Sequence, residues 1–122
     1  MRVMAIIGAS RTGKTTRIGE LIRECVARGE RVGAIKHTHH PLNEEDRGDT
    51  RVFREAGAEP VILAGDGEAV IFRGTATSRV TFEKAKDLLT HFDSVDVIFI
   101  EGFKQEDAWP RYTVEESRIV RP

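Results

Sequence analysis

The sequence predicts an α/β domain of three layers, in which helices cover both faces of a largely parallel sheet that carries a small β-hairpin. Two apolar runs without alternating polar residues, 3–7 and 95–100, are typical of strands that are buried on both faces. Elsewhere apolar residues recur at helical spacing, so that strands and helices alternate along the chain. This alternation favours a parallel sheet over an all-α or all-β architecture.

The first third of the chain predicts a strand, a helix and a second strand. Residues 3–7 form the first strand, and a helix begins near Thr15 and stops before Gly29. Residues 31–35 form the second strand, which completes a βαβ unit. The residues expected on the buried face of the helix are Ile18, Leu21, Ile22, Cys25 and Val26.

A long polar segment, 36–49, follows the second strand. It is too long for a simple connection, and loops of this length in compact domains are often functional. Asp49 or Thr50 can cap a short helix, which ends at Ala56 and Gly57.

The remaining elements are a hairpin, a helix, a buried strand and a weaker final strand. Residues 60–74 contain two apolar strands around the Gly-Asp-Gly turn at 65–67, which predicts the hairpin. The apolar run 95–100 is the buried strand, and the tail after Pro110 predicts an edge strand. The helix lies between the hairpin and the buried strand, and its apolar face is made of Phe82, Ala85, Leu88, Leu89 and Phe92.

The composition limits the class of protein. The 122 residues suit one domain, 1–122, and 39% of them are hydrophobic and 32% charged. With a net charge of −1, the chain has no global attraction to nucleic acid or to anionic membranes, and we expect neither as a partner. The single cysteine, Cys25, excludes an internal disulfide. Since there is also no signal peptide and no apolar run that could span a bilayer, we expect a reducing, cytoplasmic location.

The stretch "GASRTGKTT" directly follows the first strand and has the spacing Gly-x4-Gly-Lys-Thr of a phosphate-binding loop. The glycines let the backbone curl, so that its N–H groups point at phosphate oxygens at the positive end of the next helix. The lysine adds a charge for the β- and γ-phosphates, and the threonine hydroxyl is a ligand for Mg²⁺. Arg11 either contacts a phosphate, in cis or across a dimer, or is a surface residue. The loop predicts a P-loop NTPase-type domain whose nucleotide-binding residues are Gly8, Ala9, Ser10, Arg11, Thr12, Gly13, Lys14, Thr15 and Thr16.

Two acidic residues also fall where a ligand of a parallel sheet binds, beyond the carboxyl ends of the strands. Glu101 follows the buried strand and, if that strand neighbours the first one, lies beside Thr15. It could hold the magnesium ion or its water shell, orient an attacking water, or serve only as a structural carboxylate. Asp49 is either a helix cap or a second carboxylate at the metal. Asp96, at the start of the strand, lies at the wrong end and is expected to be structural.

Three histidines lie within four residues after the second strand, at 37, 39 and 40. Zinc binding is one interpretation, but no cysteine is near and structural zinc sites need four ligands. A solvated or substrate-contacting loop is the favoured interpretation. Lys36 and His37 directly follow the predicted strand and can therefore reach a ligand over the sheet edge.

Four stretches in this order resemble the molybdopterin-guanine dinucleotide biosynthesis protein MobB family: "GASRTGKTT", "RGERVGAIKHTHH", "GDTRVFREAGA" and "IEGFK". The first is generic to phosphate-loop proteins, whereas "IKHTHH" combined with "AGA" and "EGFK" is much more specific. The match covers most of residues 1–111. The sequence departs from the family pattern at Arg11, where a small residue is usual, and at Gly48-Asp49, which is one residue tighter. It also ends at Pro122, where family members normally continue.

The resemblance implies a homodimer that binds GTP with Mg²⁺ and hydrolyses it weakly. It further implies an adapter that acts beside the molybdopterin guanylyltransferase to make the guanine-dinucleotide form of the molybdenum cofactor. No Asn-Lys-x-Asp guanine signature is present, so guanine preference comes from the resemblance alone. By position, Thr15, Glu101 and Asp49 match metal or catalytic residues, with Glu101 and Asp49 as the catalytic pair. Lys36, His37 and His40 match a loop that approaches the nucleotide or cofactor.

Three other functions share the same phosphate loop. A small-molecule kinase would need an acceptor pocket and a lid, for which 73–79 is the only candidate. A metallochaperone GTPase would use the histidine loop, with His37 and His40 as ligands. A protein that only binds phosphate, without turnover, is the third.

Overall fold

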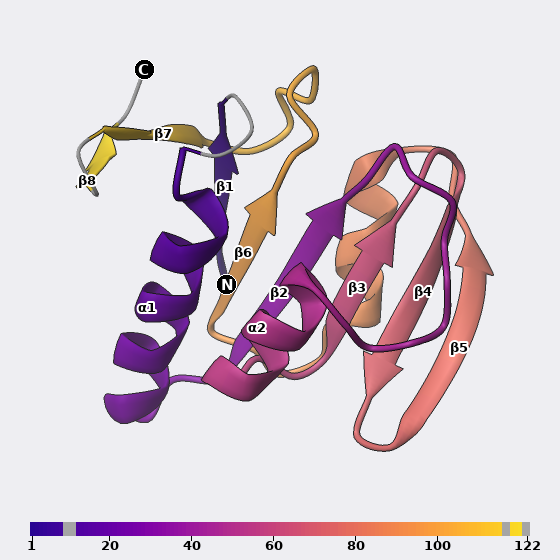
Figure 1. Cartoon of the computed structure of the whole chain (residues 1–122), viewed down its shortest axis with the longest axis horizontal. Helices are drawn as coiled ribbons and strands as arrows, with labels where there is room; N and C mark the ends of the chain where they lie inside the picture. The colour runs from indigo at the N-terminus through magenta and orange to yellow at the C-terminus, as the bar shows by residue number, and fades with distance from the viewer. Residues whose placement is uncertain (9–11, 116–117, 121–122) are drawn as a thin grey trace.

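The structure is a computed structural model that describes residues 1–8, 12–115 and 118–120. Its centre is an eight-stranded sheet in the order β5-β4-β3-β2-β6-β1-β7-β8 (Figure 1). The five central strands, β3, β2, β6, β1 and β7, are parallel to one another. Strands β4 and β5 on one side of the sheet, and β8 on the other, pair antiparallel with their neighbours. The strands are β1 Arg2–Ile7, β2 Val32–His37, β3 Val61–Ala64, β4 Glu68–Arg73, β5 Ala76–Thr81, β6 Val97–Glu101, β7 Arg111–Glu115 and β8 Arg118–Val120.

The helices lie on both faces of this sheet. Helices α1 (Lys14–Ala27) and α2 (Asp49–Ala56) cover the front face in Figure 1, and the 3-10 helix η1 (Ala85–His91) lies behind the sheet. The two faces bury separate apolar clusters, and Ile18 and Phe53 belong to the front one whereas Leu88 and Trp109 belong to the back one. The predicted three-layer α/β fold with a largely parallel sheet is confirmed.

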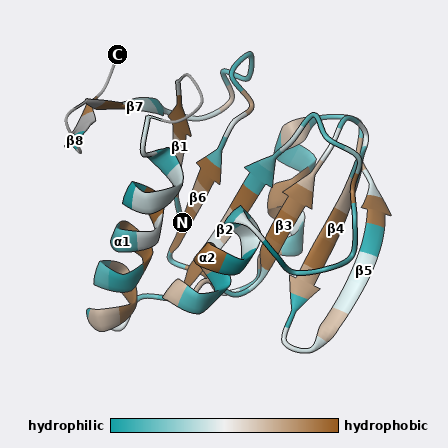
Figure 2. Cartoon of the chain, viewed as in Figure 1, coloured by the Kyte–Doolittle hydropathy of each residue, from teal (hydrophilic) through white to brown (hydrophobic). Residues whose placement is uncertain are grey.

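The central strands carry the long apolar runs from which the fold was predicted. All five residues of β6 are buried, and β1, β3 and β4 are predominantly hydrophobic (Figure 2). Helix α1 buries Ile18, Ile22 and Cys25 on its inner side and presents hydrophilic residues outward. Cys25 is thus a buried core residue, as expected, and burial together with Glu30 raises the pKa of its thiol.

The pairing of β1 with β6 positions the predicted site. In this parallel pair Ile6 lies opposite Glu101, so the end of β6 reaches the start of the phosphate loop. Strand β2 pairs with the other side of β6, and there Lys36 lies opposite Glu101. The carboxyl ends of three neighbouring strands therefore meet at one sheet edge, which confirms the expected convergence.

The hairpin is also confirmed, but the segment after it differs from expectation. Strands β3 and β4 pair antiparallel around Gly65–Gly67. Residues 73–79, the lid candidate, largely form strand β5, which pairs with β4 from Glu68↔Thr81 to Arg73↔Ala76. The lid interpretation is wrong because a second tight turn, at Gly74 with a φ of 58°, folds the polar segment back onto β4.

The helix predicted after the hairpin is confirmed, whereas the place of the final strand in the sheet was predicted incorrectly. The helix after the hairpin is a 3-10 helix, in which Ala85 and Leu88 are buried three residues apart on one side. Strand β7 begins directly after Pro110 but is not an edge strand, because it lies between β1 and β8.

Helix α2 is not capped by a side chain. The cap is Gly48, with a φ of 67°, and no side-chain cap hydrogen bond is formed. The Thr50 hydroxyl donates to the Arg47 carbonyl at 3.1 Å, and Asp49 stands in the first turn with its carboxylate directed at Lys36. The cap prediction is wrong because glycine adopts this backbone conformation readily and leaves the aspartate available for another partner.

In the described part of the chain, no helix is long and apolar enough to cross a membrane.

Candidate functional site

The structure describes both ends of the predicted phosphate loop, Gly8 and Gly13. Gly8 follows β1 and Gly13 precedes α1, with φ values of 137° and 84° that favour glycine. Lys14 is the first residue of α1, and its Nζ donates to the Gly8 carbonyl across the loop at 3.2 Å. The first N–H groups of α1 have no partner within the helix and point toward the loop. Ala9, Ser10 and Arg11 lie outside the described residues.

Burial lowers the pKa of Lys14, and neighbouring Lys36 and Lys104 act in the same direction against the attraction of Glu101. Lys36 and Lys104 are thus close enough to Lys14 to repel its ammonium group, while Glu101 and Asp49 attract it. Thr12 stands beside Gly8, and its hydroxyl oxygen is 3.9 Å from the position that a Cβ on Gly8 would take.

Glu101 is the central side chain of the site. Only 4% of the residue is exposed, and its Oε1 accepts a hydrogen bond of 2.6 Å from the Thr15 hydroxyl. Its second oxygen, Oε2, forms an ion pair with the ammonium group of Lys36. The predicted contact between the end of β6 and the start of α1 is therefore present.

Lys36 joins Glu101 to the second predicted carboxylate. Its Nζ lies 2.6 Å from Asp49 Oδ2 while also holding Glu101. Burial alone would lower the pKa of Lys36, but the hydrogen bonds to Asp49 and Glu101 outweigh it and raise this pKa overall. The ammonium thus stands between two carboxylates as a built-in positive charge.

A cavity of about 920 Å³ lies over this sheet edge. Most of the predicted residues line it, and His40 lies instead at a smaller neighbouring hollow of about 470 Å³. The predicted residues that line the larger cavity are Gly8, Gly13, Lys14, Thr15, Thr16, Lys36, His37, Asp49 and Glu101.

The residues Thr15, Asp49 and Glu101 fit a magnesium ion. All three offer hard oxygen donors, which Mg²⁺ prefers, and all three line the cavity into which the start of α1 faces. The two carboxylates already share one cation, the Lys36 ammonium, so that the electrostatics of the place favour positive charge.

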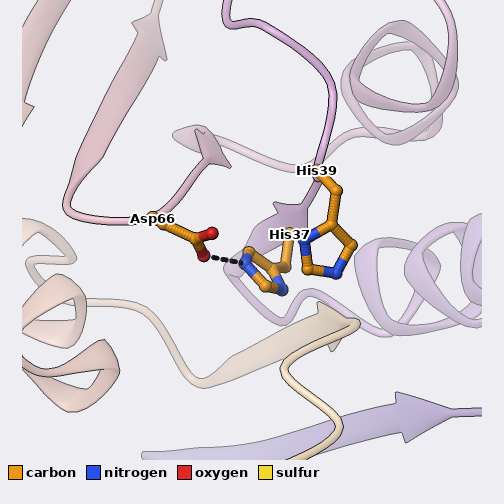
Figure 3. Close-up of side chains that lie close together, drawn as sticks. All are labelled: His37, His39 and Asp66. Carbon is orange, nitrogen blue, oxygen red and sulfur yellow. Dashed lines mark hydrogen bonds and ion pairs between the residues drawn. The ribbon is translucent and has the colours of Figure 1, made fainter.

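The opposite side of the β2 end carries a different set of side chains. The His37 ring stacks on Phe103, with centroids 4.1 Å apart and planes 5° apart. Its Nε2 lies 3.2 Å from Oδ1 of Asp66, and the Phe103 N–H donates to its Nδ1 at 3.4 Å. His39 contacts the same ring edge-on at 4.9 Å (Figure 3).

Comparison with known proteins gives the family. A sequence model described as MobB, molybdopterin guanine dinucleotide synthesis protein B, matches residues 3–118. The chain belongs to the MobB family. Two curated relatives, from Haemophilus influenzae and Escherichia coli, are named molybdopterin-guanine dinucleotide biosynthesis adapter protein. They are 36% and 35% identical to this chain over 98% and 86% of its length.

Solved structures agree with the fold. A Bacillus subtilis MobB crystal structure matches 95% of this chain and 69% of its own, with a TM-score of 0.57 and 20% identity. A MobB homologue from Bacillus stearothermophilus matches all of this chain and 66% of its own, with a TM-score of 0.55 and 24% identity. The chain spans 66% of the H. influenzae relative and 61% of the E. coli relative.

For this MobB family member, sequence reasoning placed the segment from Glu101 to Lys104 at this edge but missed Asp66, Gln105 and Glu106, all of which line the cavity. Asp66 is near His37 because of the strand register: His37 lies opposite Ala64 in the parallel pair of β2 and β3, so the turn that follows Ala64 lies beside His37. The sequence alone carries no signal for this pairing.

Proposed function

We propose that this chain is a GTP-binding adapter of molybdopterin guanine dinucleotide biosynthesis, which hydrolyses GTP weakly in the presence of Mg²⁺. One observation carries the nucleotide part: the buried Glu101 accepts a hydrogen bond from Thr15 at the beginning of the lysine-bearing helix. This joins a strand-end acid to a phosphate loop, as nucleotide hydrolysis with a metal requires. Family membership and the names of the relatives support the adapter role.

Each residue has a distinct task in this proposal. The backbone N–H groups at the start of α1 bind phosphate oxygens, and Lys14 turns from the Gly8 carbonyl to the β- and γ-phosphates. Thr15, Asp49 and Glu101 would hold magnesium, which would supply positive charge to neutralise the phosphates. Lys36 must then give up at least part of its contact with the two carboxylates.

Slow turnover follows from the same contacts. Thr15 holds Glu101 at Oε1 and Lys36 holds it at Oε2, so Lys36 competes with a metal or a water for this carboxylate. No arginine is among the described residues that line the cavity, and an arginine is what stabilises the transition state in fast GTPases. We expect a turnover number below about 1 per second, the lower end of typical enzymes.

The partners proposed with this function are a molybdopterin guanylyltransferase, the molybdenum cofactor and a second copy of the chain, in the cytoplasm. The basis is the family, since the site itself carries chemistry for phosphate and a metal only. The kinase alternative loses its lid candidate to strand β5 and is not favoured.

Calorimetric titration with GTP, ATP and pyrophosphate in the presence of Mg²⁺ tests the nucleotide part. We expect GTP to bind one equivalent, and Lys14→Ala to weaken binding roughly 100-fold, because a charged hydrogen bond contributes about 1.5–3 kcal/mol. Lys86→Ala, which removes an exposed lysine of η1 that does not line the cavity, is the matched control and should bind as the wild type does.

The three ligands separate the contributions of phosphate and base. Equal affinity for GTP and ATP would place the affinity in the triphosphate and overturn the guanine preference. Absence of binding by all three would overturn the nucleotide site itself. For the adapter role, co-purification with a guanylyltransferase is expected, and loss of molybdopterin guanine dinucleotide on deletion of the gene is the decisive measurement.

A further inference from the structure

Three possible metal ligands meet at the mouth of the cavity, from two segments far apart in sequence. His37 ends β2, His39 follows it after one residue, and Asp66 is the central residue of the turn between β3 and β4. One ligand atom from each lies within 4.8 Å of the other two. Figure 3 shows the Asp66 carboxylate directed at the His37 ring, with the His39 ring on the other side of that ring.

This cluster is separate from the Thr15, Asp49 and Glu101 site. Successive side chains of a strand point to opposite faces of the sheet, so Lys36 and His37 are directed away from each other. Lys36 contacts Asp49 of α2 on the front face, whereas His37 stacks on Phe103, which packs against the apolar cluster of the back face. A cation bound by His37 would therefore not be the magnesium ion of the proposed nucleotide site.

The distances are close to those of a coordinated ion. Two ligands that each lie about 2.0–2.2 Å from a tetrahedral zinc ion are about 3.4 Å apart. His37 Nε2 and Asp66 Oδ1 are already 3.2 Å apart. His39 is exposed, so a rotation of its side chain can bring its nitrogen nearer.

We infer that His37, His39 and Asp66 form a binding site for a divalent transition-metal ion of the zinc type. Two imidazoles and one carboxylate are donors that suit Zn²⁺, Co²⁺ and Fe²⁺ and do not suit Mg²⁺. Three protein ligands leave at least one coordination position open, which is the arrangement of exchangeable or catalytic sites and not of closed structural ones. The exposure of His39 and Asp66 gives the ion a path from solvent.

Binding of the ion has a built-in reporter. The Phe103 N–H donates to His37 Nδ1, which places the ring proton on Nε2, the atom that faces Asp66. Coordination through Nε2 moves that proton to Nδ1, where it opposes the Phe103 N–H. The hydrogen bond at 3.4 Å must then break, and the amide of Phe103 must change its environment.

In the test, Zn²⁺ and Co²⁺ are titrated into the full, tag-free chain without nucleotide. Calorimetry measures the binding of both ions, and visible absorption monitors the binding of Co²⁺. We expect one equivalent of metal, an affinity more than about tenfold lower in His39→Ala and Asp66→Asn, and a Zn²⁺-dependent shift of the Phe103 amide resonance. Both substituted side chains are exposed, so that the variants should fold, and circular dichroism verifies this. His91→Ala, which removes a histidine at the end of η1, is the matched control and should bind metal as the wild type does.

Unchanged metal affinity in both His39→Ala and Asp66→Asn would overturn the assignment, and so would a loss that follows His40→Ala in place of His39→Ala. Absence of Zn²⁺ binding in the wild type would overturn it as well. The result is independent of the proposed nucleotide site, because Lys14→Ala should bind Zn²⁺ with the affinity of the wild type.

Discussion

The two faces of the sheet edge carry neighbouring residues that are held by different kinds of interaction. On the front face, Lys36, Glu101, Asp49 and Thr15 form a network in which each charge is held by another. On the back face, His37 stacks between ring neighbours, and its acidic partner Asp66 is 84% exposed at the side chain. Charges that are paired with one another fix a geometry, whereas rings beside an exposed acid leave their ligand atoms accessible.

The difference predicts that the two acids contribute very differently to stability. Glu101→Gln leaves the partly buried Lys36 ammonium with only one carboxylate, and losing one partner of a buried ion pair costs about 3–5 kcal/mol. Asp66→Asn changes an exposed side chain, so the free energy of unfolding should stay within about 0.5 kcal/mol. Urea denaturation in EDTA measures both variants against the wild type.

Equal losses of unfolding free energy in Glu101→Gln and Asp66→Asn would contradict this difference between the two faces. A cost below about 1 kcal/mol for Glu101→Gln would mean that the network is held no more firmly than a surface ion pair. The Asp49 side chain is 38% exposed, so the loss of unfolding free energy in Asp49→Asn should lie between the losses in Glu101→Gln and Asp66→Asn.

Gly102 connects the two faces, because it lies between Glu101 and Phe103. Its φ is 104°, and a Cβ there would lie 2.8 Å from the Cβ of His37. Gly102→Ala should therefore cost about 2–4 kcal/mol, part from the backbone conformation and part from the clash. Gly74→Ala is the matched control, since its φ is 58° and a Cβ there would meet nothing within 4 Å. It should cost only the backbone part, about 1–2 kcal/mol.

Thermal unfolding of the two glycine variants sharpens the comparison. Equal costs at both positions would show that the backbone, and not the approach of His37, requires glycine at 102. A larger cost at Gly102 should be accompanied by changes in the amide resonances of both Glu101 and Phe103, because the substitution displaces the neighbouring residues on both faces of the sheet.

The smallest expected effect is the pH dependence of the front face. The pKa of Lys36 is raised in the folded state above the ordinary value of 10.5. Its contribution to stability is therefore complete below pH 10.5 and is lost as the pH rises through the folded-state pKa. The difference in unfolding free energy between the wild type and Lys36→Gln should shrink above that pH, and Lys86→Gln should show no such trend. A difference that stays constant through this range would contradict the assignment.

Most of the fold could be predicted from patterns that are local in the sequence. The apolar runs of β1 and β6 and the glycine-rich turn before α1 report burial and backbone conformation directly, and so does the Gly-Asp-Gly hairpin. Strand β5 could not be recognised, because its Ala-Thr-Ser-Arg sequence is polar and exposed and is held in place by pairing with β4. The 3-10 helix shares its apolar spacing with an α-helix over two turns, so periodicity alone does not separate them.

The front-face site was predictable in its members and less so in its contacts. The positions of Lys14, Thr15 and Glu101 follow from strand ends and the loop spacing. The role of Lys36 as the bridge between Glu101 and Asp49 depends on which strands are neighbours, and sequence patterns do not determine strand order. Asp66 joins His37 for the same reason, through the pairing of β2 with β3.

Strand β5 also has a consequence for how copies of this chain can associate. It ends the sheet on its side, and an unprotected outer strand invites intermolecular sheet growth and aggregation. Here Arg79 of β5 forms ion pairs with Glu44 and with Glu68 of β4, which places charges at that edge. A sheet continuing into a neighbouring molecule would have to strip water from these charges, so self-assembly is better sought on another surface of the molecule.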